Sequence, residues 1–561
     1  MGLWHRVCSW TSFSLLLVAA TACSPPDAEA PGLGSIAADS LSADLRLRVT
    51  GGEIRGIPSG TNAAIMAFRG IPFAAPPVGD LRWRPPQPIE PWEAVRDASE
   101  AGAICVQGGG QDLRQSEDCL FLNVWAPREI GDEPLPVLYW IHGGGYTGGS
   151  GSTQIYDGTR LAADGAVVVT INYRLNVFGF MAHPALSAES PHGASGNYGL
   201  MDMVAGLEWV RDNIATFGGD PDRVTIFGES AGAGAVMSVM LMPQAGGLFH
   251  RAIAQSNWIH GWDRPLRGSP PDFASAEAQG LSVATRLQVE GDGSDALSQL
   301  RAVEANAVLA AADEGAGSPF LLAGYVWAPN VDGWTIPDDP LSMYDQGLQH
   351  DVPLIVGMNG NEGSLMTQGL AIENPDAFVE HVRSLYPGQA DAMLAHYDAG
   401  SPDGVRRGLD HLVHDMYFAG PVLAHARSQA ALSSPVWLYH FTHEPPTAWG
   451  QTLGAHHAAE LVYVFGTLTT SDEPGERLLG LSPVGDYTEV DQQLSDAMRA
   501  YWLRFAATGD PNGVGQATWP AFTAASPAHL ELGAVIEAGA GVHANGAALW
   551  DQHEAERRAT R

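Results

Sequence analysis

The sequence predicts an α/β fold in which a large, mostly parallel central sheet carries helices on both faces. Continuous apolar runs of strand length recur along the chain, at 135–142, 166–173, 223–227, 352–358 and 435–441. Segments with helical patterns, at 201–213 and 231–240, lie between these runs. Apolar strands that alternate with helices are typical of a parallel sheet buried on both faces. In such sheets the functional residues lie beyond the carboxyl ends of the strands.

Composition narrows the range of partners. The chain has 561 residues, of which 45% are hydrophobic, so it can bury a sizeable core. Asp and Glu number 63 against 29 Lys and Arg, the net charge is −34, and every strong base is arginine. An acidic protein repels phosphate backbones and slows the approach of polyanionic substrates. The composition therefore argues against nucleic acid as a partner.

Residues 1–45 are expected to direct export rather than to fold. Residues 1–22 combine a weakly basic start with a short apolar run at 13–20, which is typical of a signal peptide. The stretch that ends at Cys23 resembles a bacterial lipobox, with Ala20 where that pattern prefers Leu. We expect lipidation of Cys23 and an outer-membrane lipoprotein; ordinary secretion into the periplasm or medium is the alternative. Residues 23–45 read as a disordered acidic tether, since they lack the apolar area that offsets chain entropy.

Residues 46–555 are expected to form a single domain, because no linker or internal repeat divides them. Within them lies one cysteine pair, Cys105 and Cys119. In an exported protein such a pair is most simply a disulfide, worth about 3 kcal/mol for a loop of this length. Buried free thiols are the alternative, and zinc would need more ligands than the pair and its neighbours offer.

The strongest chemical signal is Gly228-Glu229-Ser230-Ala231-Gly232, which matches the nucleophile elbow G-x-S-x-G. It follows the predicted strand at 223–227 and precedes an apolar helix, which is the context that the motif requires. The glycines permit a strained turn that presents Ser230, and the helix amino terminus favours negative charge that develops there. The motif predicts a serine nucleophile.

A second signal, His142-Gly143-Gly144-Gly145, directly follows the predicted strand that ends at residue 142. Hydrolases with a serine elbow place an HGGG-type oxyanion loop at such a position. We expect the amides of Gly144, Gly145 and Ala231 to donate to the oxyanion. An ordinary glycine-rich turn is the alternative.

The general base and its acid must follow the serine in the order acid, then histidine. Glu362 lies at the end of the predicted strand 352–358 and is the candidate acid. The adjacent His456 and His457 compete as the base, and spacing alone does not choose between them. His411 and His414, beside acidic neighbours, are a rival pair, but they fall in a helical pattern.

Longer motifs resemble one family, the type-B carboxylesterases, over roughly residues 46–525. Residues 217–232 resemble the serine signature of that family, and residues 117–127 resemble its second signature. Shorter similar stretches are 68–73, 172–174, Phe505 and 508–513. The resemblance implies an α/β-hydrolase fold and ester hydrolysis by a serine enzyme.

The resemblance also assigns roles. In the family the catalytic histidine precedes a Glu by three residues and a Phe-Gly by eight, and His457, with Glu460 and Phe465, fits this spacing. It implies Glu362 as the acid and a supporting set around the triad: Glu229, Ser256 and Glu460. It further implies a Cys105–Cys119 disulfide and the ion pairs Arg69–Glu117 and Arg174–Asp202.

Departures from the family pattern concern the substrate. Asn257 replaces the usual Gly after Gln-Ser, and Trp258 follows it near the expected acyl pocket. The loop between Cys105 and Cys119 contains no aromatic residue, whereas cholinesterases carry a cation-binding Trp there. Without that aromatic face the main cation–π contact for choline is missing, so we expect no cholinesterase activity.

The sequence therefore predicts that residues 46–555 form the catalytic domain of a serine carboxylesterase that hydrolyses small-molecule esters through Ser230, His457 and Glu362. No cofactor or metal is required, and the membrane is contacted only through a lipid on Cys23. The alternatives are a catalytically silent binding or adhesion module on the same fold, and an amidase or acyltransferase that uses the same triad. The natural ester and the oligomeric state stay open.

Overall fold

The computed structural model describes residues 45–60, 62–108, 114–257, 264–268, 274–313, 327–469 and 484–559. The chain divides into the units Met1–Asp39 and Ser40–Arg561, and the described residues belong to the second. The predicted signal peptide, Cys23, nearly all of the tether, and Trp258 lie outside the described residues.

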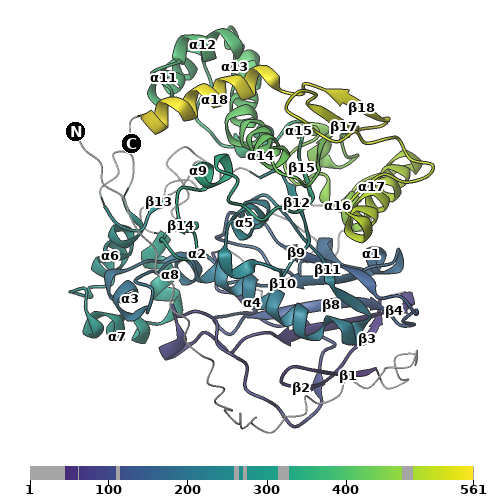
Figure 1. Cartoon of the computed structure of the whole chain (residues 1–561). Coiled ribbons are helices and arrows are strands. Elements are labelled where there is room, and N and C mark those ends of the chain that lie inside the picture. Colours follow the sequence, from purple (N-terminus) through teal and green to yellow (C-terminus); the bar gives the residue numbers. More distant parts are fainter. Residues whose placement is uncertain are drawn as a thin grey trace, which may run out of the picture. The chain divides into compact units, whose positions relative to one another are not determined.

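Among the described residues, an 11-stranded sheet organises the second unit (Figure 1). In spatial order its strands are β18 (Ile536–Ala540), β17 (Ala528–Leu532), β16 (Val436–Phe441), β15 (Leu354–Asn359), β12 (Arg251–Gln255), β11 (Gly219–Glu229), β9 (Leu135–Ile141), β10 (Val167–Ile171), β8 (Phe121–Pro127), β4 (Asn62–Pro72) and β3 (Ile57–Ser59). Every neighbouring pair from β17 to β10 is parallel, and the pairs beyond them at both edges are antiparallel. The predicted mostly parallel sheet is thus confirmed.

Short strands form smaller sheets beside it. These are β1 (Arg46–Val49) with β2 (Gly52–Arg55) and β5 (Arg96–Asp97), β6 (Ile104–Cys105) with β7 (Gln115–Ser116), and β13 (Arg264–Pro265) with β14 (Asn330–Val331).

Helices connect the strands. They are α1 (Thr159–Ala163), α2 (Asn176–Phe180), α3 (Pro184–Glu189), α4 (Tyr198–Asn213), α5 (Ala231–Val239), α6 (Ala276–Arg286), α7 (Ser294–Ala302), α8 (Ala305–Asp313), α9 (Pro340–Asp345), α10 (Gly363–Met366), α11 (Pro375–Leu385), α12 (Ala390–His396), α13 (Pro402–His414), α14 (Gly420–Ala430), α15 (Ala448–Leu453), α16 (Leu461–Phe465), α17 (Glu489–Thr508) and α18 (Ala544–Ala559). A π-helical turn, Asp415–Ala419, joins α13 to α14. None of the described helices is long and apolar enough to cross a membrane.

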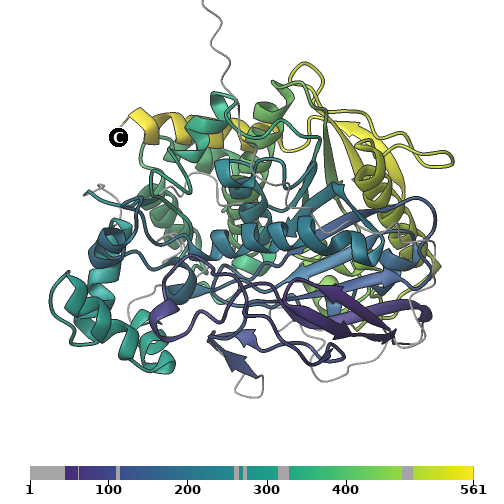
Figure 2. The same cartoon turned by 60° about the horizontal axis from the view of Figure 1, so that its bottom comes forward.

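Both faces of the sheet are covered, which explains its continuous apolar strands. On β9, Tyr139 packs into one buried cluster with α4 and α5, whereas the next residue, Trp140, packs into another with α16 and α17. Successive strand residues point to opposite faces, so both must be apolar. Figure 2 shows helices lying on either side of the sheet.

The predicted ion pairs have different outcomes. Arg174 and Asp202 pair as expected, with 2.7 Å between Nη2 and Oδ1, and both are buried. The pair Arg69–Glu117 was wrong. Glu117 instead accepts both bonds of a bidentate fork from Arg82, each 2.6 Å long, and Arg69 on β4 reaches Asp157 at 3.4 Å. The planar guanidinium of Arg82 matches a carboxylate with both N–H groups, which makes this pair the stronger one.

The predicted disulfide between Cys105 and Cys119 is present in the structure. The structure joins Cys105 on β6 to Cys119, and both side chains are buried. The bond closes the loop that carries Glu117.

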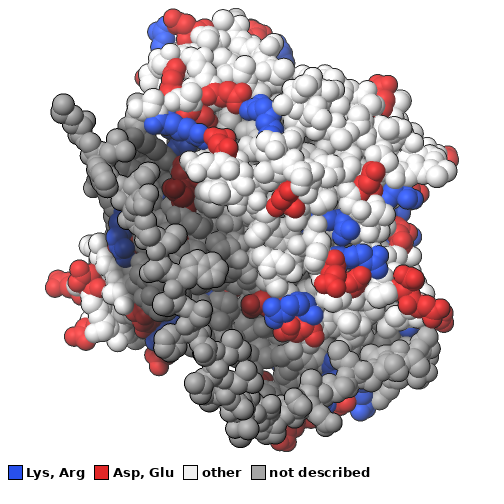
Figure 3. Space-filling model, in the orientation of Figure 1, with Lys and Arg blue, Asp and Glu red and all other residues white. Residues whose placement is uncertain are grey.

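Charges are intermingled on the surface. On the described part of the face in Figure 3, arginine side chains lie next to acidic ones and form no continuous basic patch. Arg427 pairs with Asp551 and Arg558 with Asp345, for example.

Candidate active site

The serine elbow is built where β11 ends and α5 begins. Ser230 has φ = 57°, a left-handed conformation that non-glycine residues rarely adopt. A Cβ on Gly232 would lie 2.1 Å from the carbonyl oxygen of Ile141, and one on Gly228 would lie 2.5 Å from that of Gly232. The flanking glycines are therefore required by close backbone packing, and the strained turn lifts Ser230 above the sheet.

The predicted oxyanion loop lies against this elbow. Gly144 and Gly145 follow β9 with φ of 102° and 63°, which favours glycine at both positions. A Cβ on Gly143 would lie 3.1 Å from that of Ser230, so the loop backbone passes directly beside the serine. Among the described residues, the amides of Gly144, Gly145 and Ala231 donate no hydrogen bond to the protein. Unpaired donors at this position suit a developing oxyanion.

The structure brings Glu362 and His457 together. His457 Nδ1 lies 2.6 Å from Glu362 Oε2, and neither side chain is exposed. The other carboxylate oxygen accepts from the backbone amide of Asn359 at 2.6 Å. His456 instead directs its Nδ1 to the carbonyl oxygen of His457, so only His457 contacts the acid.

The two rival histidines, His411 and His414, lie in different environments. His411 is exposed on α13, as its helical pattern predicted. His414 is buried at the end of α13, where its Nδ1 accepts from the backbone amide of Glu362 at 3.2 Å. His414 thus supports the acid from behind, a position that the sequence analysis did not predict.

Glu229 faces the imidazole nitrogen on the serine side. Its Oε1 lies 3.1 Å from His457 Nε2, and both groups are buried. Burial lowers the pKa of His457, but the charges of Glu229 and Glu362 outweigh burial and raise it to about 9. Burial also raises the pKa of Glu229 to about 8. The pair therefore holds a proton more tightly than an isolated histidine would.

Glu460 anchors a buried network next to the Glu362–His457 pair. Its carboxylate accepts from Gln255 Nε2 at 2.9 Å and from Asn359 Nδ2 at 2.6 Å. Trp502 on α17 donates to Gln255 Oε1 at 3.1 Å, and the backbone amide of Ser256 donates to the next strand. The sequence analysis did not predict roles for Gln255, Asn359 and Trp502. The position of Asn359 at the end of the strand before Glu362 is the one signal that could have suggested them.

Asn257, the departure from the family pattern, is fully buried. Its Nδ2 lies 2.8 Å from Nδ1 of His425 on α14. Burial lowers the pKa of His425 to about 3, so this ring is neutral at ordinary pH.

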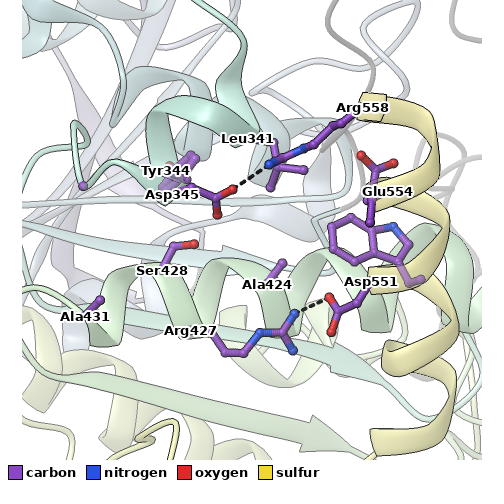
Figure 4. Close-up of a pocket in the computed structure, with 13 residues that line it drawn as sticks. Leu341, Tyr344, Asp345, Ala424, Arg427, Ser428, Ala431, Asp551, Glu554 and Arg558 are labelled. Carbon is purple, nitrogen blue, oxygen red and sulfur yellow. Dashed lines mark hydrogen bonds and ion pairs between the residues drawn. The ribbon is translucent and has the colours of Figure 1, made fainter. Parts of the chain in front are cut away.

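A separate hollow of about 410 Å³ lies between α9, α14 and α18 (Figure 4). The described residues that line it include none of Ser230, His457 and Glu362. Its arginines, Arg427 and Arg558, are each paired with an aspartate (Figure 4). The hollow is therefore distinct from the candidate active site.

A serine on a strand–helix elbow, together with a buried Glu–His pair and a glycine-rich loop, defines a serine hydrolase of the α/β-hydrolase fold. The chain belongs to the carboxylesterase family, whose sequence model matches residues 43–550.

Comparisons with individual proteins agree with this assignment. The chain is 37% identical to the fumonisin B1 esterase of Sphingopyxis macrogoltabida over 475 residues, which cover 83% of each chain. It is 36% identical to the para-nitrobenzyl esterase of Bacillus subtilis, with 84% of this chain and 91% of the relative covered. A solved structure of PNB esterase superposes with a TM-score of 0.74 at 32% identity and covers 89% of this chain and 98% of its own. The protein is a serine carboxylesterase, an enzyme that hydrolyses carboxylic esters of small molecules.

Proposed function

We propose that Ser230 attacks the ester carbonyl and that His457 and Glu362 complete the triad. His457 accepts the proton of the serine hydroxyl at Nε2, and the serine oxygen forms a bond to the carbonyl carbon. His457 then gives the proton to the alcohol oxygen as the bond between that oxygen and the carbonyl carbon breaks, which leaves the acyl-enzyme. A water molecule, deprotonated by His457, next attacks the acyl carbon, and the bond to Ser230 breaks, which releases the carboxylic acid and returns the proton to the serine. The observation that carries the proposal is the buried 2.6 Å contact between His457 Nδ1 and Glu362 Oε2, which fixes the ring beside the elbow.

The oxyanion is assigned to the amides of Gly144, Gly145 and Ala231. Each follows either β9 or Ser230, and none donates to the described protein. Donors that are already oriented cost little reorganisation when charge develops, and each contributes about 10²–10³ in turnover. Glu229 is assigned to tuning the pKa of His457, and Ser256 and Glu460 to positioning the strand ends beneath it.

The decisive experiment measures hydrolysis of p-nitrophenyl esters, from acetate to long acyl chains, by wild type and Ser230→Ala. We expect turnover by wild type and a loss of at least about 10³-fold in the folded variant. Ser238→Ala is the matched control, because Ser238 lies on α5 and its hydroxyl donates within the helix at 2.8 Å. A folded Ser230→Ala enzyme that retains full activity would overturn the assignment.

Substrate choice is tested with the same enzyme. Matched p-nitrophenyl esters and p-nitroanilides distinguish the esterase from an amidase, and we expect the ester to turn over faster. We propose that choline esters are not preferred, because the Cys105–Cys119 loop has no aromatic residue. Equal kcat/KM for acetylthiocholine and for an uncharged thioester of the same size is the expected result. A strong preference for the cation would contradict it.

We further propose export and lipidation at Cys23, on the strength of the apolar run at 13–20 and the lipobox-like stretch before the cysteine. A Cys23→Ser variant is expected to move from the membrane fraction to the soluble fraction of the expressing cells. Unchanged membrane association of that variant would exclude the lipid anchor.

A further inference from the structure

A group of metal-ligand side chains lies at one edge of the sheet, away from the serine elbow. His440 lies on β16, and His529 and Glu531 lie on β17. His440 is paired in register with Glu531, and His529 is two residues earlier on the same strand. Because side chains alternate along a strand, all three project from the same face. One ligand atom of each lies within 4.8 Å of the others.

One imidazole nitrogen of each histidine in this group lacks a hydrogen-bond partner within the described part of the chain. His440 Nε2 and His529 Nδ1 are buried, and within the described part of the chain neither has a hydrogen-bond partner. His529 is only 5% exposed, and a Cβ on Gly539 of β18 would lie 2.5 Å from its other nitrogen, so the ring is held closely against the sheet. Buried polar atoms are rarely left unpaired, since each costs the free energy of desolvation. A shared partner for both nitrogens would remove that cost.

The charges on the same face also favour a cation. Glu531 on β17 stands directly opposite Glu537 on β18, in the register of an antiparallel pair. Like charges directly opposite each other destabilise a sheet. Thr442 donates to Glu531 Oε1 at 3.1 Å and so orients the carboxylate, as a second ligand layer does in metal sites. A divalent ion between the histidines and Glu531 would offset the repulsion.

We propose that His440, His529 and Glu531 bind a divalent transition-metal ion of the Zn²⁺ type. Imidazole and carboxylate ligands suit Zn²⁺, Ni²⁺ and Cu²⁺, and three protein ligands with water in the fourth position form a common Zn²⁺ geometry. Ligands about 2.0–2.1 Å from a tetrahedral ion are about 3.4 Å apart, so small side-chain rotations close the present spacing. The ion ties β16 to β17 at the edge where β17 and β18 lie side by side (Figure 1).

A neighbouring group of possible ligands is not proposed as a metal site. His414, Asp415 and His543 also have ligand atoms within 4.8 Å of one another. Nδ1 of His414 accepts from the amide of Glu362, so in the neutral ring the proton is on Nε2, which then has no lone pair for a metal. Asp415 already accepts from the hydroxyl of Tyr397 at 3.1 Å and contacts His543 Nδ1 at 3.0 Å. The metal therefore belongs to the β16–β17 group alone.

The test titrates untagged, EDTA-treated enzyme with ZnCl₂ by calorimetry and with Co²⁺ by visible absorption. We expect one ion per chain and the intense d–d bands of four-coordinate Co²⁺. His529→Asn and Glu531→Gln should each lose at least about tenfold in affinity, because even loss of an outer-layer partner costs about 10–100-fold. His411→Asn is the control, since His411 is exposed on α13 and should leave binding unchanged.

Folding is followed separately by circular dichroism and by esterase activity, because none of the proposed ligands contacts the triad. Zn²⁺ should raise the Tm of wild type but not that of Glu531→Gln, whose side chain is only partly buried and is expected to tolerate the change. Absence of saturable Zn²⁺ binding by wild type would overturn the proposal. Equal affinity of wild type and Glu531→Gln would also overturn it, and neither result bears on the catalytic serine.

Discussion

Glu229 occupies the most consequential position among the residues around the proposed triad. It lies next to Ser230 in sequence, and its Oε1 lies 3.1 Å from His457 Nε2, the nitrogen that accepts the serine proton in the proposed mechanism. Its charge is the largest influence that raises the pKa of His457, which reaches about 9. Only neutral imidazole acts as a base. The rising limb of the plot of kcat/KM against pH should therefore lie at a higher pH than it would for a histidine with an ordinary pKa.

Glu229→Gln should move this limb to lower pH by about one unit or more, because an opposite charge at this distance shifts a pKa by about 1–3 units. The measurement is kcat/KM for a p-nitrophenyl ester from pH 5 to 10. Glu460→Gln is the comparison variant, since Glu460 has the smallest influence on His457 and should shift the limb less. A limb that stays in place in Glu229→Gln would show that the carboxylate does not set the pKa of the base.

At the scale of elements, local patterns predicted the strand–serine–helix elbow, the parallel centre of the sheet and the strand before Glu362. Each depends on a continuous stretch of sequence. The edge strands were not predicted, because β18 is short and mostly exposed and carries little apolar signal.

Contacts between distant segments could not be predicted in the same way. His414 lies 52 residues from Glu362 along the chain, and only the packing of α13 against α10 places it behind the acid. Arg69 and Arg82 both come from the same amino-terminal region, and the path of the Cys105–Cys119 loop determines which of them reaches Glu117. Side-chain pairing of this kind depends on tertiary structure rather than on spacing.

For the whole molecule, net charge and buried histidines make opposite predictions about acid stability. The net charge of −34 falls toward zero as the pH approaches the isoelectric point near 4.7, which relieves self-repulsion. Burial, however, lowers the pKa of His142 to about 4, that of His425 to about 3 and that of His414 well below its ordinary value. A group whose pKa is depressed in the folded state stabilises the fold above its unfolded pKa, about 6.5, and loses that contribution as the pH falls.

We expect the histidines to prevail, so the free energy of unfolding should fall between pH 7 and pH 5 although the net charge shrinks. His142 and His425 each cost about 2 kcal/mol over that interval, and His414 adds to the loss, against a typical total of about 5–15 kcal/mol. Glu229, whose pKa is raised from 4.5 to about 8, partly opposes the histidines, because its contribution is lost as the pH rises between those values. On the alkaline side His457, whose pKa is raised from 6.5 to about 9, loses its contribution as the pH rises through that range. Urea unfolding at successive pH values measures how the free energy of unfolding depends on pH. His425→Asn should reduce the loss of stability on the acid side, whereas His411→Asn, at an exposed position, should not. A stability that increases steadily toward pH 4.7 would mean that self-repulsion, and not the buried histidines, governs the acid limit of the fold.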